Sequence, residues 1–227
     1  MSNLNKSKGN MYDWVTHTWS PIIGCSHQCQ YCYVKTYRDL PTTPFLNGNF
    51  PNLGVNNTIF VGHMCDMFAT NVDDLIINSI LDHCSKFDNT YVFQSKNPKR
   101  FLDIEFPVNS IFGTTIETNR DDLVATISSA PPPTERAKYI GKLFNHVQTF
   151  ITIEPILDFD VNDFIQLILK ASPTFINIGA DSKKHGLPEP SGDKIVEFIN
   201  AISPYIEIRE KTNLSRLVKG WPNYGTN

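Results

Sequence analysis

The chain has 227 residues, of which 41% are hydrophobic and 19% charged, values typical of a globular protein with one substantial core. It contains no run of about eighteen apolar residues, and the polar opening MSNLNKSKGN lacks the apolar region of a secretory signal. We therefore expect no membrane partner and a cytoplasmic location in which thiols stay reduced. The formal net charge of -3 argues against a protein that coats nucleic acid electrostatically.

The first distinctive feature is a group of cysteines that follows a predicted strand at residues 16–24. Three of the chain's five cysteines lie within eight positions, at Cys25, Cys29 and Cys32. One loop with three thiolates is able to hold a [4Fe–4S] cluster and leave its fourth iron open for an external molecule. Structural zinc is the alternative, with a fourth ligand from among His27, His63 and Cys65.

Strands and helices are predicted to alternate along the rest of the chain. A segment rich in Pro, Gly and Asn at residues 41–57 is expected to be an irregular insertion that borders the site. Runs of β-branched and aromatic residues predict strands at 58–62, 91–95, 110–117, 149–154, 175–180 and 205–210. Capped amphipathic segments predict helices at 72–87, 119–128, 134–145, 161–171 and 192–202. Because several strand runs are apolar nearly throughout, they favour an α/β fold with a parallel sheet, either an incomplete barrel or an open doubly wound sheet.

Taken together, the motifs resemble those of a known enzyme family. Residues 25–32, CSHQCQYC, resemble the Cys-x3-Cys-x-aromatic-Cys signature of radical S-adenosylmethionine (SAM) enzymes, with Tyr31 as the aromatic residue. Later segments resemble, in order, the strand-end motifs of a phage-associated branch of unassigned function, distantly similar to spore photoproduct lyase: IFVGHMCDMF, FQSKNPKRF, FGTTIETNR, FITIEPILD, FINIGADS and IEIREKTNL. The resemblance implies a single-domain, TIM-like partial (β/α)6 barrel over residues 13–215, between a polar tail at 1–12 and a C-terminal tail at 216–227.

The same resemblance implies a mechanism. A [4Fe–4S] cluster on the three cysteines, with SAM at its open iron, would yield a 5′-deoxyadenosyl radical that abstracts hydrogen from a substrate. The electron would come from an external donor of the flavodoxin or ferredoxin type, in the host cytoplasm if the gene belongs to a phage. The sequence leaves open the oligomeric state and whether the enzyme is a lyase, an isomerase or a transferase.

Polar residues at the predicted strand ends are candidate ligands of SAM, because ligands gather at the carboxyl ends of barrel strands. The resemblance implies that Gly62, His63 and Asp66 lie near the methionyl amino group. It also implies that Thr115 and Glu117 lie near the ribose or the carboxylate. A helix-capping role is the alternative for Asp66, and a structural hydroxyl is the alternative for Thr115.

Two other strand-end residues need a partner or a ligand. Glu154 is a carboxylate between a buried strand and a proline, and Asn177 is an amide inside a strand, so both are predicted to face the cofactor pocket. A satisfied core amide is the alternative for Asn177. Three cations are assigned to the substrate, with a solvated surface as the alternative: Lys96, Arg209 and Lys211.

Three further residues are assigned from their positions. In spore photoproduct lyases a hydrogen-donating cysteine lies shortly before the position equivalent to Asp66, where this chain has His63. Cys65 is the predicted replacement, because positions 63 and 65 share a face in an extended segment. Cys84 lies in a helical run and is expected to be an inert buried residue, and Arg136 opens a predicted helix and is expected at the surface.

The resemblance favours a nucleobase or nucleoside substrate, free or within DNA. Three aromatic residues are candidate stacking partners of an extruded base: Tyr33, Phe45 and Phe68. The acidic overall balance favours a nucleotide, a nucleoside or a short single strand over a tightly bound duplex. One alternative is a radical SAM peptide-modifying enzyme, which the presence of only two other cysteines disfavours, and another is a zinc-stabilised binding module without enzymatic activity.

Overall fold

A computed structural model describes residues 3–48, 50–143 and 146–218 of the chain. Its centre is an eight-stranded sheet in the order β1-β2-β5-β6-β7-β8-β9-β10, in which every neighbouring pair except β1 and β2 runs parallel. The strands are β1 (Asn5–Lys6), β2 (His17–Trp19), β5 (Thr58–Val61), β6 (Thr90–Gln94), β7 (Ser110–Thr115), β8 (Thr149–Ile153), β9 (Phe175–Ile178) and β10 (Glu207–Glu210). The predicted α/β class with one parallel sheet is confirmed.

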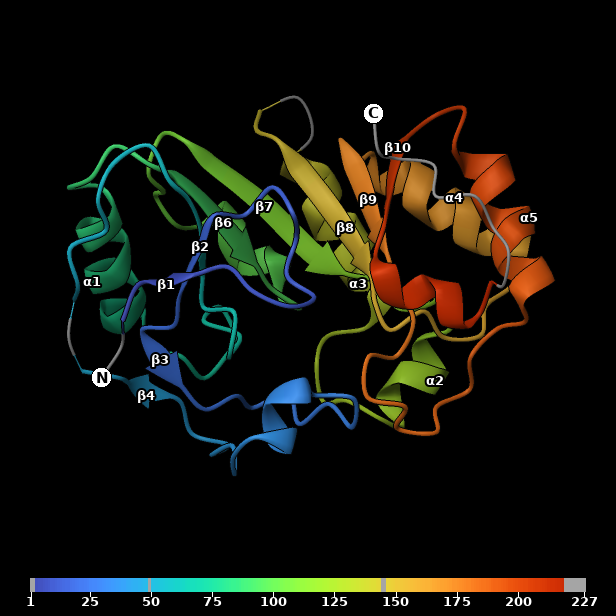
Figure 1. Cartoon of the computed structure of the whole chain (residues 1–227), viewed down its shortest axis with the longest axis horizontal. Coiled ribbons are helices and arrows are strands. Elements are labelled where there is room, and N and C mark those ends of the chain that lie inside the picture. The colour runs from blue at the N-terminus through green and yellow to red at the C-terminus, as the bar shows by residue number, and fades with distance from the viewer. Residues whose placement is uncertain (1–2, 49, 144–145, 219–227) are drawn as a thin grey trace.

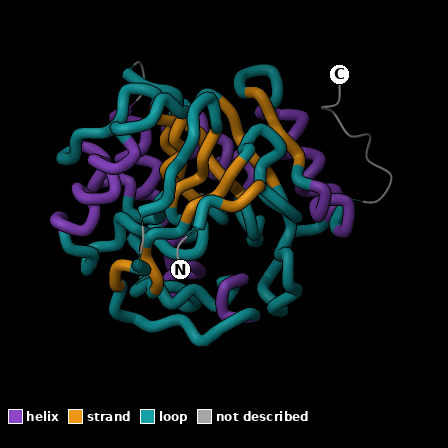
Figure 2. The backbone as a smooth tube through the Cα atoms, turned by 60° about the vertical axis from the view of Figure 1, so that its left-hand side comes forward, coloured by secondary structure: helices purple, strands orange, loops and turns teal. Residues whose placement is uncertain are grey.

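Helices connect the parallel strands. The α-helices are α1 (Asp74–Cys84), α2 (Asp121–Ala125), α3 (Pro133–Ile140), α4 (Val161–Ala171) and α5 (Gly192–Ile202). The 3-10 helices are η1 (Tyr33–Thr36), η2 (Pro98–Leu102), η3 (Gly141–Leu143) and η4 (Thr212–Arg216). Figure 1 shows α1 at one end of the sheet and α4 and α5 at the other, and Figure 2 shows the strands as a curved sheet with helices along its outer side.

Several predicted boundaries need correction. The expected strand at 16–24 is divided into β2 and β3 (Ile22–Ile23), because Pro21 between them has no N–H for a sheet ladder. The insertion at 41–57 contains β4 (Phe45–Leu46), which pairs antiparallel with β3. The helix expected at 134–145 begins at Pro133 and gives way to η3 at Gly141, while residues 144–145 lie outside the described part of the chain.

The helix-covered face of the sheet holds the main hydrophobic core. Phe164 and Ile168 of α4 are four residues apart, so they share one side of the helix, and both are fully buried. They belong to the same apolar cluster as Phe93, Ile151 and Ile178 of the sheet. Burial of this stripe fixes the helices against the strands and so positions the strand ends.

The other face of the sheet, here called the inner face, is covered by the N-terminal segment. Tyr12, Trp14 and Val15 pack on side chains that alternate with those of the main core, among them Phe150 and Phe175. Trp14 lies edge-on to both phenylalanine rings. Strand β1 also joins the sheet. The division into a tail at 1–12, a barrel at 13–215 and a tail at 216–227 stays a prediction, and residues 219–227 lie outside the described part.

Candidate functional site

The inner face changes in polarity toward the carboxyl ends of the strands. An apolar layer lies beneath the N-terminal segment and consists of Phe60, Val92, Phe150 and Phe175. Two positions further along the strands the inner side chains form a neutral layer, made of Gln94, Thr115, Thr152 and Asn177. At the strand ends lies a charged rim, made of Lys96, Glu117, Glu154 and Lys211. Ligands of such folds bind at this end of the sheet.

The neutral layer is linked by hydrogen bonds to the N-terminal segment. The Tyr12 hydroxyl lies 2.7 Å from Gln94 Oε1 and 2.5 Å from Thr152 Oγ1, and Gln94 Nε2 donates to Thr115 Oγ1 at 3.0 Å. Asn177 is 2% exposed, and its Nδ2 has no hydrogen-bond partner among the described residues. A buried donor of this kind is able to bind a ligand acceptor without breaking a bond within the protein.

The cysteine loop, residues 24–32, follows β3 and contains all three predicted cluster ligands. Cys25, Cys29 and Cys32 are free thiols, with Cys29 buried and the other two half-buried. Gly24 starts the loop with a φ of +101°, and a Cβ there would lie 2.8 Å from the carbonyl oxygen of Thr43. The predicted insertion therefore borders the site, and it requires glycine at the start of the loop.

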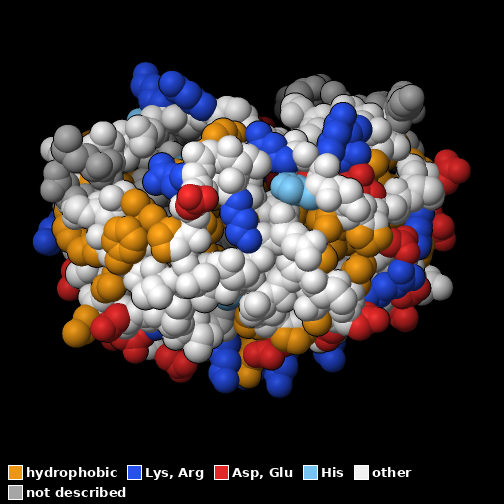
Figure 3. Space-filling model, turned by 90° about the horizontal axis from the view of Figure 1, so that it is seen from below, with side chains coloured by type: hydrophobic (Ala, Val, Ile, Leu, Met, Phe, Trp, Pro, Cys, Tyr) orange, Lys and Arg blue, Asp and Glu red, His pale blue; other side chains and the backbone are white. Residues whose placement is uncertain are grey.

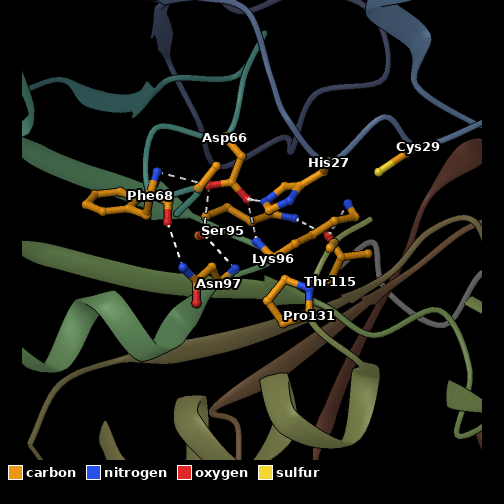
Figure 4. A network of polar contacts seen from close by, with 12 residues as sticks. His27, Cys29, Asp66, Phe68, Ser95, Lys96, Asn97, Thr115 and Pro131 are labelled. Atoms are coloured by element: carbon orange, nitrogen blue, oxygen red, sulfur yellow. Dashed lines mark hydrogen bonds and ion pairs between the residues drawn. The ribbon is translucent and has the colours of Figure 1, made fainter. Parts of the chain in front are cut away.

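His27 anchors the cysteine loop to the end of β5. Its Nε2 lies 2.9 Å from Asp66 Oδ2, and Asp66 also accepts from Ser95 Oγ and the Lys96 N–H, both at 2.7 Å, and from the Phe68 N–H at 3.0 Å (Figure 4). Burial opposes ionisation of Asp66, but His27 and these donors outweigh it and lower the pKa of Asp66 to about 2. Asp66 is thus a fully engaged carboxylate that joins β5, β6 and the cysteine loop.

A second wall of the loop comes from the segment between α2 and α3. Gln30 N–H donates to the Ile127 carbonyl at 2.8 Å, and Ser129 N–H donates to the His27 carbonyl at 2.7 Å. The Ser128 hydroxyl lies 3.1 Å from the sulfur of Cys29. The helix expected at 119–128 ends at Ala125, so these residues form a connection, and nothing in their types marks it as part of a site.

A buried ion pair supports the loop at Tyr31. The Tyr31 hydroxyl donates to Glu117 Oε1, and Arg136 Nη1 donates to Glu117 Oε2 at 2.7 Å. Glu117 and Arg136 are both completely buried, so the expectation that Arg136 lies at the surface is wrong. Burial opposes ionisation of Glu117, but Arg136 and then Lys96 outweigh it and lower the pKa of this carboxyl. The sequence hints at the buried position of Arg136 only through the three prolines that precede it at 131–133.

Lys96 connects this ion pair to the neutral layer. Its Nζ lies 3.9 Å from Glu117 Oε1, donates to Thr115 Oγ1 at 3.2 Å and sits 5.3 Å from the centre of the Tyr31 ring. The structure therefore brings together four residues that the sequence assigned to cofactor or substrate: Tyr31, Lys96, Thr115 and Glu117.

On the other side of the rim, Glu154 pairs with Lys211. Glu154 Oε2 lies 2.7 Å from Lys211 Nζ, and its Oε1 accepts from Asn213 Nδ2 at 2.7 Å and from Asn10 Nδ2 at 2.8 Å. The Lys211 ammonium also lies 4.8 Å from the centre of the Tyr12 ring. The carboxylate expected to need a partner therefore has several, including one from the N-terminal segment.

The segment after β5 holds the remaining cofactor candidates and Cys65. Gly62 adopts a φ of +81°, which turns the chain, and His63 Nδ1 lies 2.8 Å from Ser20 Oγ. Burial lowers the pKa of His63 to about 4, so the ring is neutral near pH 7. Burial, with smaller contributions from Cys25 and Asp66, raises the pKa of Cys65 well above its usual range. Cys65 therefore keeps its S–H at neutral pH.

Two predicted contact residues lie away from the rim. Arg209 points to the apolar layer, with its guanidinium 3.6 Å from the centre of the Phe175 ring, and pairs with Glu207 at 2.7 Å. Phe68 is completely buried in the main core and is not available for stacking. Cys84 is buried in α1, as expected for an inert residue.

The donor set of the cysteine loop fits an iron–sulfur cluster with three protein ligands. Within the described ranges, no group of three or more His, Cys, Asp or Glu side chains, these three cysteines included, converges as the ligands of a metal ion, so the fit rests on the type and spacing of the three free thiols and not on their arrangement. Of the three candidates for a fourth zinc ligand, His27 is engaged by Asp66 and His63 by Ser20. Each contact uses one ring nitrogen, and a ligating histidine commonly bonds a carboxylate or hydroxyl through its other nitrogen, so the zinc alternative keeps all three candidates.

The fold is similar to those of several solved structures, although the sequence itself finds no match. No protein-family model and no curated protein matches the sequence. Among solved structures, a spore photoproduct lyase variant with bound AdoMet and dinucleoside spore photoproduct matches with a TM-score of 0.55 at 10% identity, over 89% of this chain and 65% of that one. Another variant of the lyase gives a TM-score of 0.61 at 10% identity, over 90% and 79%. Streptococcus suis SuiB bound to S-adenosylmethionine gives 0.56 at 12% identity, over 89% and 52%.

At these identities the likeness is one of fold, and the chain spans 65% of the first lyase structure and about half of SuiB. Spore photoproduct lyase and SuiB are both radical SAM enzymes. The prediction of a single-domain, mostly parallel α/β fold is confirmed at this level, and the match to these structures agrees with the predicted partial barrel. No helix within the described ranges has the length and apolar character needed to cross a membrane. This chain has the fold of the radical SAM enzymes.

Proposed function

We propose that this protein is a radical SAM enzyme that acts on a nucleobase or nucleoside. The observation that carries the proposal is the position of the cysteine loop, which is joined through His27 to the end of β5 and through Tyr31 to Glu117 just beyond β7. The three cysteines thereby lie at the carboxyl ends of the strands, on a fold shared with enzymes that bind SAM. These contacts fix the loop at two of its residues, His27 and Tyr31.

In this proposal Cys25, Cys29 and Cys32 hold a [4Fe–4S] cluster. Cluster and SAM, when bound, supply a 5′-deoxyadenosyl radical after one electron arrives from a flavodoxin- or ferredoxin-type donor. Lys96 and Lys211 offer two cations for the carboxylate of SAM or a phosphate of the substrate. The unpaired Asn177 Nδ2 offers a donor between them, and the apolar layer beneath excludes water from the reaction.

The test is anaerobic reconstitution with iron and sulfide, followed by dithionite and SAM, with 5′-deoxyadenosine quantified by chromatography. Cys29→Ala is expected to lose the cluster absorbance and the product, whereas Cys84→Ala, which changes a buried cysteine of α1, keeps both. If the wild-type protein instead binds one zinc per chain and forms no cluster, the zinc-stabilised module replaces the enzyme.

Three features support a nucleobase or nucleoside substrate. Tyr33 is 38% exposed and Phe45 48% exposed, so both remain available for stacking. Seen from below, the molecule carries separate Lys and Arg side chains rather than one continuous basic tract (Figure 3). The first matching structure holds a dinucleoside. A scattered basic surface suits a nucleotide or a short single strand better than a duplex.

The substrate class is tested by measuring 5′-deoxyadenosine formation with added nucleosides, dinucleotides, single-stranded and duplex DNA, and a peptide mixture. We expect dinucleotides or short single strands to give the largest stimulation, with a weak dependence on salt. Stimulation by the peptides alone would identify a peptide-modifying enzyme.

Cys65 is the proposed hydrogen donor that quenches the substrate radical. A thiol donates a hydrogen atom whereas a thiolate has none to give, and burial keeps Cys65 protonated. Donation leaves a thiyl radical on Cys65, which regains a hydrogen atom either from 5′-deoxyadenosine or, as an electron and a proton, from the external donor and solvent. Because the S–H proton exchanges with solvent, the wild-type enzyme in D2O is expected to place deuterium in the product and Cys65→Ala is not. Equal deuterium content in the two products would remove Cys65 from the mechanism.

A further inference from the structure

Ser128, between α2 and α3, lies against the central cysteine of the loop. Its Oγ is 3.1 Å from Cys29 Sγ and 3.3 Å from the carbonyl oxygen of His27, and it accepts the Ala130 N–H at 3.1 Å. Ser128 and Cys29 are each 8% exposed, so water competes little for either group. The contact joins residues 99 positions apart in the sequence.

The direction of this hydrogen bond follows from counting protons. A hydroxyl has one proton to donate, and one of its acceptor sites is taken by the Ala130 N–H. A cysteine that ligates iron is a thiolate and has no proton, so in the contact with ligated Cys29 the hydroxyl must be the donor. The competing acceptor is the His27 carbonyl, which lies 0.2 Å further away (3.3 against 3.1 Å).

We propose that Ser128 donates a hydrogen bond to the ligating sulfur of Cys29 and thereby raises the reduction potential of the cluster. The proposal rests on the proposed function. Reduction adds one electron to the cluster, and part of that charge resides on the ligating sulfurs, so a fixed donor stabilises the reduced form more than the oxidised form. No bond is made or broken through Ser128. Its effect is on how readily an external donor reduces the cluster.

Ser128 also differs from the donors around Cys25. The sulfur of Cys25 lies near the backbone N–H groups of His27 and Asp66, which no substitution removes without disturbing the fold. The Ser128 hydroxyl is a side-chain donor, so its contribution to the potential is open to mutation. Ser129 next to it is exposed and provides a matched control.

The test measures the midpoint potential of the 2+/1+ couple in the reconstituted protein without SAM, by dithionite titration followed by electron paramagnetic resonance. Ser128→Ala is expected to have a more negative potential than wild type, and Ser129→Ala the wild-type potential. Ser128→Thr and Ser128→Val form an isosteric pair that differs only in the hydroxyl, so the threonine variant is expected to have the higher potential of the two. Equal potentials in both comparisons overturn the proposal.

Failure of the proposed function and failure of the Ser128 proposal give different results. If wild type assembles no cluster, the proposed function itself fails, and this is seen before any Ser128 variant is compared. If Ser128→Ala assembles too little cluster to titrate, the threonine and valine variants decide the question, because packing volume is equal in them. The rate of iron release to a chelator gives a second readout, expected to be faster in valine than in threonine.

Discussion

The helix-covered face of the sheet is mostly apolar, with a few buried hydroxyls such as that of Thr114, whereas the inner face is apolar only beneath the N-terminal segment and becomes charged at the strand ends. On the first face, stabilisation comes from burial of Phe164, Ile168 and their neighbours, and it is spread over many contacts. On the second face, a few charged groups are buried completely, and each depends on a particular partner. The difference shows that the charged groups able to bind a ligand lie on the inner face, where their burial lowers the stability of the fold.

The rim illustrates this dependence. Glu117 and Arg136 have no exposed surface, and Arg136 Nη2 lacks a hydrogen-bond partner among the described residues. Such a pair contributes little net stability compared with apolar residues of the same volume, but loss of one member leaves the other charge buried and alone. The charged rim should therefore respond to single substitutions more strongly than the helix-covered face.

The largest effect is expected for Arg136→Met. Removing the guanidinium leaves Glu117 buried beside Tyr31, and we expect the free energy of unfolding to fall by about 3–5 kcal/mol. Ile168→Val on the helix-covered face removes one buried methyl group and is expected to cost about 0.5–1.5 kcal/mol. Urea denaturation followed by circular dichroism measures both.

The double variant with Glu117→Gln and Arg136→Met provides the control for this prediction. It removes both charges, so it should recover part of the stability that Arg136→Met loses. A loss in Arg136→Met no larger than that in Ile168→Val would contradict the contrast between the two faces.

A smaller loss of stability is expected when a buried tyrosine hydroxyl is removed from either face, but only the inner-face variant should also retain less iron. Tyr31→Phe removes a hydroxyl that donates to Glu117 at the rim, and Tyr91→Phe removes one that donates to the Cys84 carbonyl at 2.7 Å in the main core. Each removes one buried hydrogen bond, at a cost of about 0.5–3 kcal/mol, and the Cys84 carbonyl keeps the Phe87 N–H as a second donor. Because Tyr31 lies within the cysteine loop, only Tyr31→Phe is expected to lower the iron retained after reconstitution and desalting.

Iron content and urea midpoints measured on the same preparations test this expectation. Equal iron retention in the two variants, at similar losses of stability, would mean that the hydroxyl of Tyr31 does not position the loop.

The two faces also differ in how far the sequence predicts them. The helix-covered face follows from local patterns, since apolar residues at helical spacing in 161–171 and β-branched runs such as FINI identify the elements and the side chains that pack. Parallel strands then bring their carboxyl ends to one edge of the sheet, which accounts for the contact of Lys96 with Thr115 and of Lys211 with Glu154. Patterning therefore predicts the fold class and much of the rim.

What the sequence does not reveal are contacts between segments distant along the chain. Arg136 looks like a surface residue at a helix start, and only the approach of α3 to β7 buries it against Glu117. His27 is followed in the sequence by nothing that indicates Asp66 as its partner, and only the fold brings the two side chains within 2.9 Å of each other. Ser128 carries no signal at all, because a lone serine in a connecting segment has no periodicity or spacing to interpret.

The smallest predicted effect concerns pH, and it follows from the charged groups at the rim end of the molecule. Asp181, which follows β9, is 3% exposed and accepts from His185 Nδ1 at 2.8 Å and from the Lys183 N–H at 3.1 Å. Burial opposes its ionisation, but these donors outweigh it and lower the pKa of Asp181 below its usual range. A lowered pKa in the folded state stabilises the fold above the unfolded value and loses that contribution as the pH falls below it.

We therefore expect the difference in free energy of unfolding between wild type and Asp181→Asn to be constant from about pH 5 to 7 and to shrink below about pH 4. Asp39→Asn, at an exposed position, is the matched control, and its difference from wild type should change less over the same range. Urea titrations at intervals of half a pH unit measure both curves. If the difference in free energy of unfolding between wild type and Asp181→Asn stays constant down to pH 3, Asp181 does not stabilise the loop through its charge. The contrast between the two faces would then rest on Glu117 and Arg136.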